Sequence, residues 1–204
     1  MRLVIFTRYP EPGKVKTRLI PALGPEGAQR LHREMAELSL RQAFKAGVDI
    51  EIYFAGGNQQ LMENWLGPGL HYRSQAGDTL GEKLYNASED AFSEGIGRVV
   101  IIGTDCPGLT EKHINQAFYL LDTADLVLGP ALDGGYYLLG LRRACGPLFE
   151  GINWGSDQVC RQTLNAARRE NLTTELLEEL ADVDRPEDLP AWENVKRRSR
   201  GKMI

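Results

Sequence analysis

MRLVIFTRYPEPGKVKTRL, residues 1–19, is the stretch that decides the fold of this chain. The apolar run at 3–6 has the pattern of a strand that is buried on both faces of a parallel sheet. The segment 7–13 contains two prolines and a glycine, and these residues end the strand in a loop. We therefore predict a buried first strand whose carboxyl end opens directly into a loop.

Three cations follow in that loop: Lys14, Lys16 and Arg18. In open α/β sheets, ligands bind on the loops at the carboxyl ends of the strands. Arginine can bind phosphate through two parallel hydrogen bonds, and lysine acts as a compact point charge. The loop therefore suits a polyphosphate, although a solvated basic surface loop has the same sequence pattern.

Size and composition indicate a globular domain and argue against nucleic-acid-binding and membrane proteins. The 204 residues include 42% hydrophobic and 25% charged residues, which is ordinary for a globular domain. A net charge of −4 argues against nucleic acid as a partner, and the basic run at 196–202 has the pattern of a solvated tail. No stretch approaches the ~18 consecutive apolar residues of a membrane span. Three distant cysteines indicate free thiols in a reducing cytoplasm.

Apolar periodicity along the rest of the chain alternates between strand and helix. This order predicts a parallel sheet covered by helices, with right-handed crossovers between the strands. No linker or repeat interrupts it, so we expect one domain over 1–204, with 195–204 as a basic, frayed tail. The predicted strands after the first are 49–54, 70–74, 99–102, 125–128, 136–141 and 173–177, and the predicted helices are 25–46, 59–66, 79–94, 110–121 and 157–170.

Carboxylates follow two of the predicted strands. Asp105 lies just past the strongly apolar strand 99–102, so it shares a sheet edge with the cationic loop. That shared edge favours a metal ligand over the turn or capping role that Asp often has. Asp182 and Asp184 alternate with Val183 and point to one side of an extended segment. Two such carboxylates repel each other unless a divalent cation or an arginine lies between them.

Two further segments admit either a structural or a binding role. Gly134 and Gly135 suit a tight turn, and they also allow a ligand to press against the backbone. Ser156 precedes the predicted helix 157–170 as its N-cap, and the free amides at a helix N-terminus can bind an anion. The turn and the cap are the simpler interpretations.

Six motifs together resemble a known family. They are RYPEPGKVKTRL, QAGDTLGEKL, GTDCPGL, GPALDGGYYLLGL, NWGSDQV and DVDRPEDL, in this order along nearly the whole chain. The pattern resembles the glycosyltransferase-A-type nucleotide-diphospho-sugar transferase superfamily, and within it a bacterial glycosyltransferase-like branch related to 2-phospholactate guanylyltransferase. The resemblance implies a three-layer α/β/α sandwich with a mostly parallel sheet and a nucleotide held over the strand ends.

The resemblance also implies roles for individual residues, with Lys16, Arg18 and Asp105 as the catalytic ones. The donor nucleotide would be bound by Thr7, Lys14, Lys16, Arg18, Gln75, Gly77 and Asp78. The small-molecule acceptor would be bound by Asp133, Gly134, Gly135 and Ser156. Mg²⁺, or Mn²⁺ in its place, would be bound by Asp105, Asp182 and Asp184. A homo-oligomer is compatible with this pattern.

Three positions depart from the family pattern. Arg185 stands where relatives usually have threonine, so a cation lies beside the proposed metal ligands. Tyr136 and Tyr137 follow the glycine pair in place of small hydroxyl residues, which argues against phospholactate as the acceptor. GTDCP supplies one carboxylate, Asp105, where glycosyltransferases of this fold typically have Asp-x-Asp.

The leading hypothesis is a Mg²⁺-dependent nucleotidyltransferase that moves a nucleotidyl group from a nucleoside triphosphate to a small phosphorylated or anionic acceptor. A glycosyltransferase with a nucleotide-diphospho-sugar donor is the second hypothesis, since Tyr136 and Tyr137 can stack on a sugar ring. A nucleotide-binding module without catalysis is the third. The identities of the base and of the acceptor stay open at this point.

Overall fold

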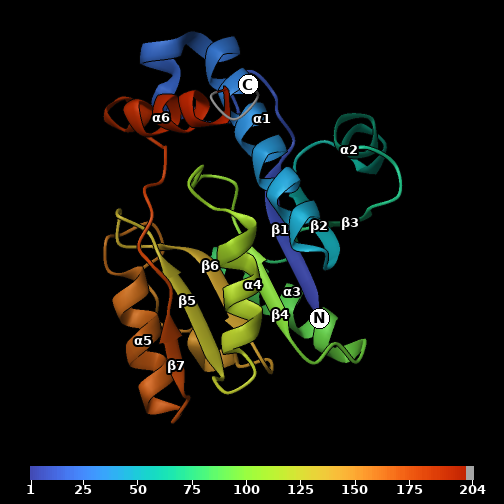
Figure 1. The fold of residues 1–204 in the computed structure, drawn as a ribbon, viewed down its shortest axis with the longest axis vertical. Helices are drawn as coiled ribbons and strands as arrows, with labels where there is room; N and C mark the ends of the chain where they lie inside the picture. Colours follow the sequence, from blue (N-terminus) through green and yellow to red (C-terminus); the bar gives the residue numbers. More distant parts are fainter. Residues whose placement is uncertain (201–204) are drawn as a thin grey trace.

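The centre of the protein is one seven-stranded sheet with the strand order β3-β2-β1-β4-β6-β5-β7 (Figure 1). The computed structural model describes residues 1–200, and 201–204, the end of the predicted basic tail, lie outside the described residues. β6 is antiparallel to β4 and β5, and every other neighbouring pair is parallel, which confirms a mostly parallel sheet. The strands are β1 (Arg2–Arg8), β2 (Asp49–Ala55), β3 (His71–Ser74), β4 (Val99–Ile102), β5 (Leu126–Pro130), β6 (Tyr136–Leu141) and β7 (Thr174–Leu176).

Helices cover both faces of this sheet (Figure 1). Because side chains alternate along a strand, Ile5 of β1 faces one helical layer and Val4 faces the other. The first layer contains α1 (Ile20–Ala46), α2 (Gln59–Leu66) and α4 (Glu111–Leu120), and the second contains α3 (Leu80–Ser93) and α5 (Val159–Arg169). The three-layer α/β/α sandwich is therefore confirmed. None of the helices within 1–200 is long and apolar enough to cross a membrane.

A separate small core joins the two ends of the chain. The helix α6 (Leu189–Arg200) packs its Trp192 against the first half of α1, which contributes Leu31 and Met35. Leu19 and Val183 are fully buried in the same cluster. This core fixes both the loop after β1 and the extended segment that precedes α6. The predicted tail at 195–204 begins within α6, which continues to Arg200.

Two helix starts differ from the predictions. α1 begins five residues earlier than expected, at Ile20, and bends at Gly24, whose φ of 69° and ψ of 166° are not helical. The prediction that Ser156 is an N-cap is wrong, because α5 begins at Val159 and Gln158 holds the cap position. Ser156 instead stabilises the turn before α5, where its hydroxyl donates to the Asn153 carbonyl at 2.7 Å.

The reversed strand β6 determines which loop reaches the ligand-binding edge of the sheet. β5 runs towards that edge and β6 starts from it, so the hairpin loop 131–135 lies beside the carboxyl ends of the parallel strands. The loop is a tight turn, in which Gly134 has a φ of +86° and donates its N–H to the Ala131 carbonyl. A Cβ atom on Gly134 would lie 2.1 Å from the Asp157 carbonyl oxygen, so only glycine fits there.

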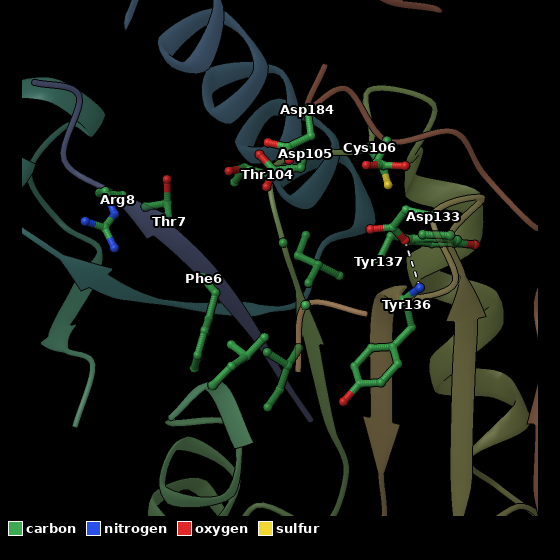
Figure 2. A pocket seen from close by; sticks show the side chains of 18 of the residues that line it. Phe6, Thr7, Arg8, Thr104, Asp105, Cys106, Asp133, Tyr136, Tyr137 and Asp184 are labelled. Carbon is green, nitrogen blue, oxygen red and sulfur yellow. Dashed lines mark hydrogen bonds between the residues drawn. The ribbon is translucent and has the colours of Figure 1, made fainter. Parts of the chain in front are cut away.

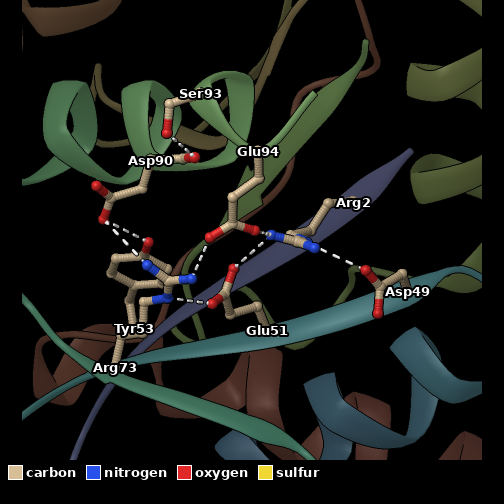
Figure 3. Close-up of polar contacts among 8 residues, drawn as sticks. All are labelled: Arg2, Asp49, Glu51, Tyr53, Arg73, Asp90, Ser93 and Glu94. Carbon is tan, nitrogen blue, oxygen red and sulfur yellow. Dashed lines mark hydrogen bonds and ion pairs between the residues drawn. The ribbon is translucent and has the colours of Figure 1, made fainter. Parts of the chain in front are cut away.

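At the opposite end of the strands, a network of charges connects β1, β2 and β3 to the end of α3 (Figure 3). Its centre is Glu51, which is 3% exposed. Arg73 donates to one Glu51 oxygen at 2.5 Å, and Arg2 donates to the other at 3.2 Å. Both arginines also pair with Glu94, and Arg2 pairs with Asp49 at 3.1 Å. The buried carboxylate is thus fully compensated by two cations.

Replacing Glu51 with Gln should lower the free energy of unfolding by about 2 kcal/mol, because two cations lose their buried partner but keep their other carboxylates. Denaturant unfolding monitored by circular dichroism measures this change. Asp49→Asn is the matched control, since Asp49 binds the same Arg2 but is 50% exposed. The control should cost less than about 0.5 kcal/mol. Equal losses in the two variants would show that burial of Glu51 contributes nothing.

Candidate functional site

A cavity of about 670 Å³ opens at the carboxyl edge of the sheet, and we call it the cleft (Figure 2). The ends of β1, β2 and β4, the hairpin loop before β6 and the segment before α6 all contribute to its lining. A side pocket of about 370 Å³ adjoins the cleft, and the two share the lining residues Asp133, Gly155, Ser156, Asp182 and Asp184. Segments far apart in the sequence therefore converge on one hollow surface.

Lys16 connects three of these segments. Its backbone is left-handed, with a φ of 48°, and its side chain is only 4% exposed. The ammonium nitrogen lies 2.7 Å from Asp105 Oδ1, 2.5 Å from the Val183 carbonyl oxygen and 3.9 Å from Asp184 Oδ1. A buried cation with an exposed carboxylate beside it is an arrangement suited to a charged ligand at the rim.

Arg18 extends the same chain of charges into the side pocket. Its guanidinium donates to Asp184 Oδ2 at 2.5 Å, so Asp184 lies between Lys16 and Arg18. The Asp188 carboxylate accepts from the backbone N–H groups of Asp184 and Arg185 at 3.0 and 2.7 Å. These bonds hold Asp184 in place. They also keep the local backbone capped where the family pattern has threonine.

Asp182 and Asp184 both line the cleft, as their alternation with Val183 predicts. Val183 is the buried anchor between them, and its N–H donates to the Asp105 carbonyl at 2.9 Å. Burial raises the pKa of Asp182, and the negative charge of Asp133 raises it further. Asp182 therefore faces the hairpin loop, whereas Asp184 faces the two cations.

The carboxylates present can hold a divalent cation only with help from a ligand. Within residues 1–200, no three His, Cys, Asp or Glu side chains form a group that could bind a metal ion by themselves. Asp105 and Asp184 both approach the point that the Lys16 ammonium occupies. Two hard carboxylates fit Mg²⁺ or Mn²⁺, because these ions take their other ligands from water and phosphate oxygens.

The buried hydroxyl of Thr7 is a further polar group of the cleft lining. The residue is buried at the end of β1 and lines the cleft, and within the described part of the chain its hydroxyl has no hydrogen-bond partner. Buried polar atoms nearly always have a partner in native proteins. The Thr7 hydroxyl can therefore pair with a bound molecule only if its side chain turns towards the cleft.

Of the residues predicted to bind the base or ribose, Gln75 lines the cleft but Gly77 and Asp78 do not. Gln75 lines the cleft, and its amide nitrogen donates to the carbonyls of Thr7 and Tyr53, which leaves its side-chain oxygen free to accept. Gly77 and Asp78 do not line the cleft or the side pocket. They lie in the turn that precedes α3, where the Asp78 N–H donates to Glu82 of that helix at 2.7 Å.

The structure brings most of the other predicted site residues together. Arg18 lines the side pocket, and Gly134 lines neither hollow because it faces α5. The predicted residues that line the cleft are Thr7, Lys14, Lys16, Gln75, Asp105, Asp133, Gly135, Ser156, Asp182 and Asp184.

Arg8 was not predicted as a site residue, but it is exposed at the end of β1 and lines the cleft. Among the described residues, Arg8 forms no ion pair, so its charge is available to a ligand. Its carbonyl accepts from His32 Nε2 at 2.8 Å, and burial lowers the pKa of that imidazole. Its position, directly after Thr7 and close to the end of the predicted first strand, is the sequence feature that could have identified it.

Comparisons with known proteins show which family the chain resembles. Residues 38–156 match the family described as "Uncharacterized protein conserved in bacteria (DUF2064)". A 2-phospho-L-lactate guanylyltransferase of Methanocaldococcus jannaschii is 27% identical over 184 residues, which span 86% of this chain and 75% of the relative.

Solved structures extend the comparison to the fold. A protein of Desulfovibrio desulfuricans G20, called a nucleotide-diphospho-sugar transferase, has 36% identity and a TM-score of 0.88, over 92% of this chain and 84% of that one. The Rv0371C protein of Mycobacterium tuberculosis H37Rv, in complex with manganese, shares the fold alone, with 12% identity and a TM-score of 0.55 over 93% and 96% of the two chains. The chain therefore belongs to the DUF2064 family, within the nucleotide-diphospho-sugar transferase superfamily.

Proposed function

We propose that this protein is a nucleotidyltransferase that moves a nucleotidyl group from a nucleoside triphosphate to a small phosphorylated or anionic acceptor. The observation that carries the proposal is the buried Lys16 ammonium, 2.7 Å from Asp105 at the rim of the cleft. The relationship to a guanylyltransferase supports the same reaction class. Together they favour a reaction in which charge on phosphate is neutralised at this rim.

In the proposed reaction, an acceptor oxyanion forms a bond to the α-phosphorus, and the bond between that phosphorus and the bridging oxygen of the β-phosphate breaks. The electron pair leaves with pyrophosphate, and no proton has to move when the acceptor is already ionised. Lys14, Lys16 and Arg18 bind the leaving phosphates, and Thr7 and Gln75 hold the nucleoside. The cleft accelerates the reaction by holding the reactants in position and by neutralising phosphate charge, without a covalent intermediate.

Acceptor binding is assigned to the side of the cleft near α5. Asp133, Gly135 and Ser156 line the cleft there, while Gly134 sets the shape of the turn. Asp105, with Asp184 or Asp182, would hold Mg²⁺ or Mn²⁺ against the phosphates. When bound, such an ion neutralises charge on the phosphate oxygens.

The reaction is proposed to take place in the cytoplasm, within a single domain and without nucleic acid or membrane partners. Cys106, Cys145 and Cys160 are free thiols, which supports a reducing compartment. Burial raises the pKa of the Cys106 thiol, so this residue at the cleft is an inert neutral group at physiological pH.

A glycosyltransferase is the second candidate, because the D. desulfuricans relative is called a nucleotide-diphospho-sugar transferase. The test is product analysis after incubation with nucleoside triphosphates or nucleotide-sugars, Mg²⁺ and a panel of small phosphorylated and carboxylate acceptors. Release of pyrophosphate supports nucleotidyl transfer. Release of free nucleoside diphosphate from a nucleotide-sugar, with no pyrophosphate from any triphosphate, would replace our proposal with glycosyl transfer.

Binding of the preferred nucleoside triphosphate with Mg²⁺ should raise the melting temperature by about 5–10 °C at a hundredfold excess over Kd. This follows because such an excess stabilises the folded state by about 2.7 kcal/mol. Adding EDTA should remove more than half of the shift, since the carboxylates then face the phosphates directly. A thermal-shift panel of four triphosphates, their diphosphates and nucleotide-sugars measures this. A shift that EDTA leaves unchanged would contradict a metal-bridged donor.

A further inference from the structure

The part of the cleft below its charged rim is apolar, and we call it the apolar wall. Strands β1, β4 and β6 form its floor, and the starts of α3 and α5 form its two sides. In Figure 2, Phe6 and Tyr136 point away from Asp105 and Asp184 into this part of the cleft. The apolar wall consists of Phe6, Leu80, Leu84, Ile101, Leu139 and Val159.

Charge is confined to the other part of the lining. Every Lys, Arg, Asp and Glu side chain that lines the cleft comes from a strand end, a loop or the segment 182–184. The most exposed member of the apolar wall is Leu80, at 47%, although it lines a cavity. Leu80 therefore leaves apolar surface open to the cleft, and pockets that bind small molecules are lined mainly by apolar side chains.

The two sides of the apolar wall are held at a fixed separation. Trp154, from the turn before α5, packs against Gly81 of α3, where an added Cβ would lie 2.8 Å from the indole nitrogen. The Trp154 ring also contacts Tyr136 edge to face, with 6.4 Å between ring centroids. The apolar wall is therefore preformed: Trp154 keeps α3 and the turn before α5 at a fixed distance.

The base and the sugar of the donor have polar groups that the apolar wall cannot hydrogen-bond. A base or a sugar buried against aliphatic side chains would lose hydrogen bonds to water without replacing them. The rim at the ends of β1 and β3 offers the free Gln75 oxygen and the Arg8 guanidinium. The donor is therefore best held at the rim, which leaves the apolar wall to the second substrate.

We propose that the apolar wall binds the apolar body of the acceptor, so that the acceptor is an anionic group attached to a hydrophobic or aromatic moiety. This inference rests on the proposed function, since it names the class of the second substrate at the same cleft. It also explains why the glycine pair precedes two tyrosines. Tyr136 adds ring surface to the pocket where a phosphate-binding site would need small hydroxyl groups.

The probe for this test is 1-anilinonaphthalene-8-sulfonate, an aromatic ring system that carries one anionic group. Its fluorescence should report one saturable site on the wild-type chain. Leu80→Gln and Val159→Thr, on opposite sides of the wall, should each weaken the probe's Kd about fivefold, because each removes apolar contact. Leu176→Gln is the matched control, since Leu176 is 50% exposed on β7 and lies outside the cleft, and its Kd should stay within twofold of wild type.

A second titration is done in the presence of the Mg²⁺–nucleoside triphosphate that gives the largest thermal shift. The probe's Kd should then stay within twofold, because donor and probe occupy different parts of the cleft. Displacement of the probe by the nucleotide would overturn the proposal and assign the apolar wall to the base. Absence of saturable binding, or equal binding by all variants, would also overturn it. If no nucleotide shifts the melting temperature, the proposed function fails, while the variant series still decides whether the wall binds an apolar ring.

Discussion

Asp105→Asn should lower the rate of pyrophosphate release by about a thousandfold while the protein stays folded. Asparagine keeps the shape of the side chain but removes the charge that faces Lys16 and the proposed metal ion. Lys16 would then keep Asp184, at 3.9 Å, as its carboxylate partner, and the metal ion would have one fewer carboxylate to hold it. The measurements are steady-state turnover with the best acceptor from the product screen and calorimetric binding of the Mg²⁺–triphosphate, which should weaken at least tenfold.

The matched control for Asp105 is Asp122→Asn. Asp122 is also a surface carboxylate paired with a cation, Arg98, but it follows α4 and lies outside the cleft. Turnover of this variant should stay within twofold of the wild type. If Asp105→Asn retained a tenth or more of the wild-type rate, the carboxyl end of β4 would not be the reacting centre.

Lys16→Met should reduce turnover by at least a hundredfold and also lower the free energy of unfolding by about 2 kcal/mol. Both effects come from the same buried ammonium, which bonds to Asp105 and to the Val183 carbonyl. Methionine fills the space of the aliphatic stem, so the loss reports the charge and its hydrogen bonds. Turnover and urea unfolding measure the two effects separately.

Lys14→Met removes the same charge from the same loop as Lys16→Met, so a comparison of the two variants shows whether the buried position of Lys16 matters. Lys14 belongs to the same loop but is exposed, and within the described chain it pairs only with Glu11, at 2.5 Å. Its replacement should change turnover by less than about tenfold and leave the unfolding free energy within about 0.5 kcal/mol. Similar losses of turnover in both variants would mean that the loop acts through its net charge rather than through Lys16.

The central strands β1 and β4 were predictable because each contains a short, uninterrupted apolar run. Residues 3–6 and 99–102 became neighbouring strands, and Lys16 of the loop after the first contacts Asp105 of the loop after the second. The prediction worked because the carboxyl ends of parallel strands share an edge, so a local signal fixes a long-range neighbour. The segment Asp182–Asp184 joined them because Val183 is apolar and must be buried.

The roles of Gly77, Gly134 and Leu80 could not be predicted from the sequence pattern. Gly77 and Gly134 both have positive φ, but their missing Cβ atoms make room for the protein itself rather than for a ligand. Leu80 belongs to the same apolar stripe of α3 as Leu84, and nothing in the periodicity separates the exposed residue from the buried one. Side chains that line a cavity and side chains that fill a core follow the same pattern, so only coordinates distinguish them.

The position of Val183 has a consequence for how the protein is made. The last strand of the sheet ends at Leu176, but Asp184 reaches Lys16 only once Val183 and Trp192 are packed against α1. A ribosome delivers the amino terminus first, so the nascent polypeptide completes its sheet before it completes the proposed reaction centre. We therefore expect the proposed activity to appear only after α6 has docked, later than the sheet has formed.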